Sequence, residues 1–435
     1  MVKDFFSKDK KIYDSLHGFV RFGTSLRSVI DSVPFQRLHY IHQLGISYLV
    51  YPGATHTRFE HSLGVMELAT RIFHNLCKSV RPDVFALVPR KGSAEYHYWR
   101  KVLRMAALCH DIGHLPFSHV AEKELLGDKG HESITYQLIH SRYLKEIFKP
   151  LQEEFAQIFP DRDFIEDISK IALGEKKYEQ ITQKKLSSWE KVVSEIITGD
   201  FFGADRIDYL LRDSKSTGVA YGVFDYEQLI EMLRILPCPE KGIEALSLGI
   251  NENGLESCEA LLLARHFMNK RIYQYSSVKA YNFHLKRFLQ LFFEDIDLSC
   301  LDTYLSYNDA DIISALGIAA KDPKRKGNLE AQRIMQRKHR FKALALNQEI
   351  PEEELLDQCK KKGIPNASFA FEPKKIALSQ KSLAFPVSRR HLMVEAATEC
   401  SDLLNKVAHS QPGWIYFSPD YEEPILEALD NLKSL

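Results

Sequence analysis

Apolar residues recur at helical spacing along most of the chain between residues 62 and 233. The run that follows Ser62 is typical: its apolar positions lie three and four residues apart, which predicts an amphipathic helix with Ser62 as its N-cap. Those positions are Leu63, Val65, Met66, Leu68, Ala69 and Ile72. Pro116 and the polar stretches 127–130 and 199–203 interrupt the pattern, so this part of the chain is predicted to be a series of helices.

Two short segments have the pattern of strands instead. Residues 11–22 predict a β-hairpin around Leu16-His17-Gly18, and residues 243–250 predict a strand that ends at the Asn-Gly-type turn 251–254. Helices are expected at about 256–275 and 279–296. Beyond Cys300 short strands and helices alternate, so the expected fold is mainly α, with a helical core, short β-hairpins and a smaller α+β C-terminal region.

The length of the chain predicts two domains. At 435 residues it exceeds the usual size of a single hydrophobic core, and the change of pattern places the boundary near residue 300. We therefore expect a metal-dependent domain over 1–300. We also expect an α+β domain over 301–435, with a regulatory or oligomerising role.

Composition narrows the class of protein only slightly. Hydrophobic residues make up 45% and charged residues 27%, and the formal net charge is zero, so nothing global favours nucleic acid or an anionic membrane. The seven cysteines are scattered without a Cys-x-x-Cys pair, which favours free thiols in a reducing cytoplasm. No apolar N-terminal segment or stretch of 18 apolar residues is present, so no membrane span is expected.

A histidine and an aspartate stand side by side at the end of an apolar helical stretch. His110 and Asp111 follow Met105 to Cys109, and Gly113 is a natural helix stop, so both side chains are expected in the last turn, able to converge on one ion. An isolated His-Asp pair is more often a hydrogen-bonded pair in a core. Here His61 and Asp205 lie at two further predicted helix ends, and the four residues together predict a metal site with open coordination positions.

The nitrogen and oxygen ligands of that set suit one divalent Fe, Mn, Zn or Ni ion, and the sequence does not choose among them. A second group of polar residues follows the metal helix: His114, His119, Glu122, His131 and Glu132. His119 and Glu122 are three residues apart, so the carboxylate can orient the imidazole as a general acid. His131, just before Glu132, is the alternative acid. The competing interpretation is that these are surface histidines near a helix start.

Several strings resemble the HD-domain phosphohydrolases, in particular their deoxynucleoside triphosphate triphosphohydrolase branch. They run in the family's order over roughly residues 10–280. The matching strings are Phe35-Gln36-Arg37-Leu38, Gln43-Leu44-Gly45, residues 51–65, residues 109–119 and Asp205-Arg206-Ile207-Asp208-Tyr209. The resemblance implies an HD-domain core, iron or manganese as the metal, and Mg²⁺ with the triphosphate.

The resemblance also implies a set of substrate contacts. Arg58, Arg206, Arg265 and Tyr209 would hold the phosphates, and Gln43, next to Leu44, would bind the 3′-hydroxyl together with Asp213. Tyr273 would pack under the sugar and exclude a ribose 2′-hydroxyl, and Gln274 would approach the base. Without the resemblance, ordinary core packing is the simpler interpretation of Tyr273. Asn269 and Tyr275 depart from the histidines of the human relative.

The expected reaction is hydrolysis of deoxynucleoside triphosphates to deoxynucleoside and inorganic triphosphate. One alternative is another HD activity, a nucleotide phosphomonoesterase or phosphodiesterase. A different class is a nucleotide-responsive HD protein that binds nucleic acid or a partner, although an intact metal set with a general acid argues against it.

Regulation and assembly follow only from the resemblance. It implies a homo-dimer or homo-tetramer and a nucleotide effector bound near residues 10–36. A family arginine that takes part in this binding is replaced by His39 in this chain. The segment 321–342 carries nine Lys or Arg against two acidic residues, including Arg333, Arg337, Lys338 and Arg340. Such a run is usually a solvated helix face; an anionic effector site or a nucleic-acid contact are the alternatives.

Overall fold

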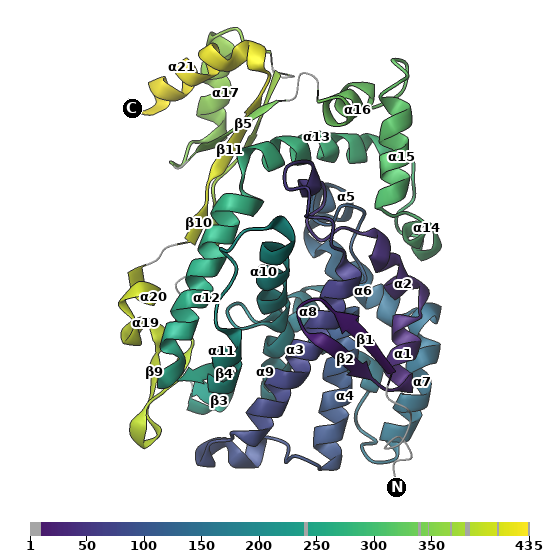
Figure 1. Ribbon diagram of the computed structural model, residues 1–435, viewed down its shortest axis with the longest axis vertical. Helices are drawn as coiled ribbons and strands as arrows, with labels where there is room; N and C mark the ends of the chain where they lie inside the picture. Colours follow the sequence, from purple (N-terminus) through teal and green to yellow (C-terminus); the bar gives the residue numbers. More distant parts are fainter. Residues whose placement is uncertain are drawn as a thin grey trace.

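The computed structural model describes residues 10–238, 242–337, 341–346, 348–365, 368–378, 383–406 and 409–433. The protein is mainly helical, with a few small sheets and an α+β C-terminal region (Figure 1). This confirms the predicted fold class. Met1 to Asp9, in which no apolar leader pattern was found, lie outside the described residues, as do Lys338 and Arg340 of the basic segment.

Up to residue 292 most of the chain is helical, as the 3.6-residue pattern predicts. The α-helices are α1 Thr24–Ile30, α2 Val33–Gln36, α3 Arg58–Lys78, α4 Ala94–Cys109, α5 Glu122–Leu126, α6 Gly130–His140, α7 Arg142–Ala156, α8 Phe164–Thr182, α9 Ser188–Thr198, α10 Ala204–Thr217, α11 Tyr226–Met232, α12 Leu255–Met268 and α13 Ser276–Phe292. A π-helical turn, Asn269–Tyr273, links the last two.

Later in the chain the elements are shorter. The helices are α14 Leu301–Leu305, α15 Asp309–Ala319, α16 Asn328–Met335, α17 Glu352–Lys361, α19 Ala397–Cys400, α20 Asp402–Lys406 and α21 Glu422–Lys433. The strands of the whole chain are β1 Lys10–Asp14, β2 Gly18–Phe22, β3 Leu233–Cys238, β4 Gly242–Asn251, β5 Lys342–Leu346, β6 Phe369–Glu372, β7 Lys375–Leu378, β8 Pro386–Ser388, β9 Val394–Ala396, β10 His409–Gln411 and β11 Gly413–Phe417.

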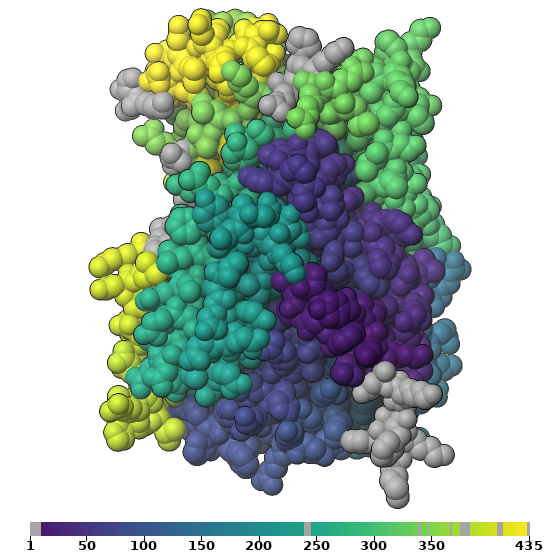
Figure 2. Space-filling model, viewed as in Figure 1, coloured from purple at the N-terminus to yellow at the C-terminus, as the bar shows by residue number. Residues whose placement is uncertain are grey.

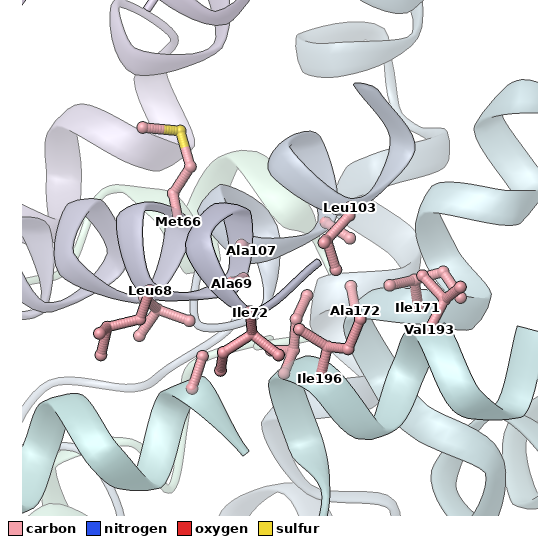
Figure 3. Packing of buried hydrophobic residues seen from close by; sticks show 14 of the residues in the cluster. Met66, Leu68, Ala69, Ile72, Leu103, Ala107, Ile171, Ala172, Val193 and Ile196 are labelled. Carbon is pink, nitrogen blue, oxygen red and sulfur yellow. The ribbon is translucent and has the colours of Figure 1, made fainter. Parts of the chain in front are cut away.

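The main core lies where α3, α4, α8 and α9 pack against one another. In Figure 3, Ala69 of α3 lies beside Ala107 of α4, and Ile72 points toward Ile196 of α9. The helical spacing found in the sequence produces this buried face. The predicted cap was wrong: α3 begins at Arg58, because Thr57 and Glu60 form a capping box, and Ser62 is buried within the helix. The metal helix α4 likewise ends at Cys109, one residue before His110.

Both predicted β segments are present. β1 and β2 form an antiparallel hairpin in which Asp14 lies opposite Gly18, and β4 covers the expected strand. The sequence did not predict β3, which pairs with β4. Its residues directly follow the apolar helical pattern that ends near residue 233, so no separate strand was recognised. The β3-β4 pair is extended by β8, parallel to β4, and then by β9.

The strands of the C-terminal region belong to separate sheets. β5, β11 and β6 form an antiparallel sheet packed against α17 and α21, whereas β8 and β9 join the sheet of β3 and β4. Figures 1 and 2 show these yellow-green segments at the top and at the left side of the molecule. The division at residue 300 stays a prediction.

Residues just beyond 300 also hold the loop that follows the His-Asp pair. The hydroxyl of Tyr304 donates to the carbonyl of Gly113 over 2.5 Å, and Asp309 accepts from the backbone N–H of Phe117 over 2.7 Å. Phe117 and Ser118 both have left-handed backbones, with φ of 59° and 60°. Such backbones are costly for residues other than glycine, so these hydrogen bonds stabilise a strained loop beside the site.

In the basic segment, Lys326 pairs with Glu294 and Arg333 pairs with Glu330. The exposed Lys326 agrees with the solvated-face interpretation, whereas Arg333 is largely buried and lies over the ring of Phe341. Among the described residues, no helix combines the length and the apolar character that crossing a bilayer requires.

Ile72 tests the core assignment because its side chain is fully buried between the helices. We expect Ile72→Ala to lower the free energy of unfolding by about 2–5 kcal/mol, since it removes buried apolar atoms and leaves a cavity. Val33→Ala, at an exposed position, is the control and should change it by less than about 0.5 kcal/mol. Equal effects of the two substitutions in chemical denaturation would contradict this packing.

Candidate metal centre and active site

The four predicted metal ligands come from three helix ends. His61 lies in the first turn of α3, His110 and Asp111 directly follow α4, and Asp205 lies in the first turn of α10. The structure brings them together: His61 Nε2 is 3.1 Å from Asp205 Oδ1 and 3.5 Å from Asp111 Oδ2. His110 Nε2 is 3.8 Å from Asp205 Oδ1 and 3.4 Å from Asp111 Oδ1.

The other ring nitrogens of both histidines are already engaged. His110 Nδ1 lies 2.8 Å from the carbonyl oxygen of Ala107, so this nitrogen carries the proton and Nε2 presents a lone pair. That Nε2 is buried and has no hydrogen-bond partner. His61 Nδ1 lies 2.8 Å from Asp208 Oδ2. A metal ion among the two Nε2 atoms and the carboxylates would satisfy groups that are costly to bury unpaired, so this donor set fits a divalent transition metal.

The charges around the site agree with such an ion. Burial lowers the pKa of His61, but its hydrogen bonds with Asp205 and Asp208 outweigh burial and raise that pKa to about 10. The carboxylates around His61 thus favour a positive charge at this position, as they would favour a bound metal ion. Burial favours the neutral form of Asp111, yet Arg58 and His110 hold its pKa well below the usual range. Arg58 Nη1 donates to Asp111 over 2.5 Å.

The predicted general-acid group is also assembled. Ligand-type atoms of His114, His119, Glu122 and His131 all lie within 4.8 Å of one another. Glu122 accepts from His119 Nδ1 over 2.5 Å and from His131 Nδ1 over 2.7 Å. The ring of His114 stacks on that of His131, with centroids 3.6 Å apart, and its Nε2 is 3.2 Å from Asp111.

Glu122 is held ionised between the two imidazoles. Burial raises its pKa, but the hydrogen bonds from His119 and His131 outweigh this and hold that pKa far below its usual range. Each imidazole thus carries a proton on Nδ1 and leaves Nε2 to exchange one. The side chain of His119 is 66% exposed and that of His131 only 12%, so His119 is the better placed of the two for proton transfer to a bound molecule.

Residues of both groups face one cavity of about 1320 Å³. Most predicted site residues lie on its wall: Gln43, Leu44, Arg58, His110, Asp111, His114, His119, His131, Asp205, Tyr209, Asp213 and Tyr273. His61 and Glu122 are not part of the wall and contact the residues that form it. Arg206, Arg265 and Gln274 do not line the cavity in this structure.

The predicted sugar contacts form a connected group. The hydroxyl of Tyr273 donates to Asp213 Oδ2 over 2.8 Å, and Asp213 Oδ1 is 2.7 Å from His56 Nε2. The side-chain oxygen of Gln43 is buried without a hydrogen-bond partner and belongs to a residue of the cavity wall. The Gln43 oxygen is therefore available to a ligand hydroxyl, whereas each oxygen of Asp213 already has one partner.

Arg206 and Arg265, which do not line the cavity, lie close enough to repel each other. Burial lowers the pKa of Arg265, and the charge of Arg206 lowers it further, to about 10. Arg206 Nε is buried without a partner. An anion bound between the two guanidinium groups would relieve both effects. Gln274 accepts from Trp414 Nε1 over 2.9 Å, so here its side chain contacts β11.

Sequence reasoning missed the residues behind the metal ligands. Asp208 contacts His61 and His17, and Arg212 pairs with Asp208 and Asp14. One signal was available, because Asp208 and Arg212 lie three and seven residues after Asp205 on one helix, and such residues share a face. The contact with His17 joins residues 191 positions apart, and no local pattern indicates it.

Comparisons with known proteins show to which family the chain belongs. The HD domain matches residues 58–210, and an HD associated region matches residues 224–362. A hypothetical protein from Aquifex aeolicus is 33% identical, with a TM-score of 0.74, over 97% of this chain and 100% of that one. An uncharacterised protein of Methanocaldococcus jannaschii is 30% identical over 312 residues, which are 71% of this chain and 55% of that protein.

The human deoxynucleoside triphosphate triphosphohydrolase SAMHD1 is 30% identical over 283 residues, covering 61% of this chain and 42% of that enzyme. The chain thus spans only about half the length of these curated relatives. The chain belongs to the HD-domain family of phosphohydrolases, and the predicted family is confirmed.

The metal site is tested by the metal content of the purified protein. We expect about one transition metal per chain in the wild type and a large loss in Asp205→Asn, because the amide is a poorer ligand than the carboxylate. Asp213→Asn is the matched control: it lines the same cavity without contacting the two imidazoles, and should retain the metal. Equal metal content in all three proteins would contradict the assignment.

Proposed function

We propose that this protein hydrolyses deoxynucleoside triphosphates to deoxynucleoside and inorganic triphosphate. One observation carries the proposal: the wall of one large cavity includes His110, Asp111 and Asp205 of the candidate metal site, His119 with its partner Glu122 just behind, and Gln43 with an unpaired amide oxygen. The name of the human relative agrees with this substrate class.

We assign the metal to His61, His110, Asp111 and Asp205, with Fe, Mn, Zn or Ni as candidates and Mg²⁺ accompanying the triphosphate. When bound, a divalent metal activates water and polarises a phosphoryl oxygen. Arg58, which already contacts Asp111, lies where it would pair with phosphate oxygens. Arg206, Arg265 and Tyr209 would hold the rest of the triphosphate after a movement of the two arginines toward the cavity.

The bond between the α-phosphorus and the ribose 5′-oxygen breaks in this reaction, so that oxygen must gain a proton. His119 would supply it from Nε2, because its Nδ1 is bound to Glu122 and the ring lines the cavity. Glu122 fixes the orientation of the ring, and His131 shares that carboxylate. His114, between Asp111 and His131, would orient the metal ligand.

Sugar selection would depend on Tyr273. Its hydroxyl is held by Asp213, so the ring is fixed at the cavity wall and would contact C2′ of a bound sugar. Gln43 and Asp213 would bind the 3′-hydroxyl, Leu44 would contact the nucleoside, and Gln274 would approach the base if it left Trp414. We also propose that the protein forms a homo-dimer or homo-tetramer and binds a nucleotide effector, on the basis of the family resemblance alone.

Product analysis tests the reaction and the sugar preference together. Metal-loaded protein incubated with dATP should release deoxynucleoside and inorganic triphosphate, and should prefer dATP to ATP. Tyr273→Ala should narrow that preference because it removes the ring that excludes the 2′-hydroxyl. Tyr273→Phe keeps the ring and is the control. Release of orthophosphate, or of a monophosphate, would instead indicate a phosphomonoesterase or phosphodiesterase.

The proton donor is tested by His119→Ala. We expect turnover to fall by roughly 10²–10⁴-fold with the metal content unchanged, because the general acid is lost and the metal ligands are intact. His140→Ala is the control for loss of a histidine and should leave turnover unchanged, because His140, at the end of α6, contacts Ser169 of α8 and does not line the cavity. Near wild-type turnover in His119→Ala, together with an inactive His131→Ala, would transfer the role to His131.

A further inference from the structure

A histidine on the N-terminal hairpin reaches the back of the metal site. His17 lies in the turn between β1 and β2, and Figure 1 shows this hairpin against α3, the helix that carries His61. His17 Nε2 is 2.7 Å from Asp208 Oδ1, and the two side chains are only 1% and 0% exposed. A contact this short, between groups this deeply buried, is a fixed part of the structure.

Asp208 connects His17 to the metal ligand. Its Oδ2 lies 2.8 Å from His61 Nδ1, on the far side of the ring from the metal position. Arg212 donates to both carboxylate oxygens of Asp208, from Nε over 2.8 Å and from Nη2 over 2.9 Å. Four contacts from three residues engage both oxygens of the carboxylate and fix its plane.

The same network holds the turn that presents His17. Asp14 Oδ1 accepts from the backbone N–H groups of Leu16 and His17, over 2.8 and 2.9 Å. Its other oxygen accepts from Arg212 Nη1 over 2.9 Å. The hairpin turn and the carboxylate behind His61 are therefore parts of one hydrogen-bonded unit.

Space around this unit is tight. A Cβ atom at Gly64 would lie 2.0 Å from Asp208 Oδ1 and 2.5 Å from Arg212 Nη2. Helix α3 can approach the carboxylate so closely only with glycine at this position. Asp208 thus has little room to move as long as its partners are in place.

We propose that His17 is a positioning residue for the metal ligand His61, acting through Asp208. Partners of ligating histidines fix the tautomer and orientation of the ring, and their loss typically weakens metal binding by about 10–100-fold. His17 acts one hydrogen bond further away, so its effect lies near the lower end of this range, about tenfold. The inference rests on the proposed metal site but not on the proposed substrate.

The test is titration of metal-free protein with Co²⁺, followed by calorimetry and by the visible absorption of the bound ion. His17→Leu keeps much of the side-chain volume but removes the donor, and should raise the dissociation constant about tenfold and alter the absorption spectrum. His17→Gln can place an N–H near the position of Nε2 and should restore both. Phe19→Ala, on the half-exposed outer side of the same hairpin, should leave both unchanged.

Wild-type affinity in a folded His17→Leu protein would overturn the proposal. So would equal weakening in Phe19→Ala, or a His17→Gln protein as weak as His17→Leu, since either result would show that the hydrogen bond is not what matters. If circular dichroism shows that His17→Leu is unfolded, His17→Asn is measured in its place. The asparagine side chain is too short to reach Asp208, so this variant also lacks the hydrogen bond. A wild-type protein that binds no Co²⁺ would refute the metal site itself, whereas failed dNTP hydrolysis with normal Co²⁺ binding would refute only the substrate.

Discussion

Two imidazole rings and several carboxylates converge in the interior of this protein, and their charges have to be balanced there. Asp111, Asp205 and Asp208 face His61 and His110, while Arg58 and Arg212 compensate only part of the negative charge. An unbalanced buried charge is strongly destabilising, so the centre needs a cation, either a proton on His61 or a metal ion. The positions of α3, α4 and α10 depend on this requirement, because each helix contributes a charged group to the same point.

Packing of distant segments keeps these groups in place. Tyr304 and Asp309 hold the loop between Gly113 and Phe117, and the N-terminal hairpin holds Asp208 from the opposite side. The left-handed backbones of Phe117 and Ser118 place Ser118 where it accepts a hydrogen bond from Arg58. The site is therefore built by residues from the beginning, middle and later part of the chain.

The sequence predicted the helical core and the hairpin because both depend on local patterns. The apolar spacing around Ile72 and the turn at Gly18 are local signals. The cap Thr57 was missed because the apolar spacing used to place the helix begins only after Ser62, and β3 was missed because an apolar run fits a strand and a helix equally well. The convergence of His61, His110, Asp111 and Asp205 was anticipated from helix ends and from the family resemblance, and their roles remain proposals.

Long-range partners could not be predicted in the same way. His17, Asp208 and Asp309 matter through contacts with residues far away in the sequence, and no periodicity encodes such contacts. The side-chain position of Gln274 on Trp414 likewise depends on where β11 packs. The substrate residues were chosen by resemblance to the family. A resemblance identifies positions in the chain, but the orientation of each side chain depends on how this protein packs.

The central claim is that His61, His110, Asp111 and Asp205 bind a metal ion. It is tested most directly by anomalous diffraction from crystals of the Mn²⁺-loaded protein, measured on both sides of the manganese absorption edge. The account predicts one strong peak bounded by Nε2 of His61, Nε2 of His110 and the carboxylates of Asp111 and Asp205. The absence of a peak there, or a peak instead among His114, His119, Glu122 and His131, would contradict it.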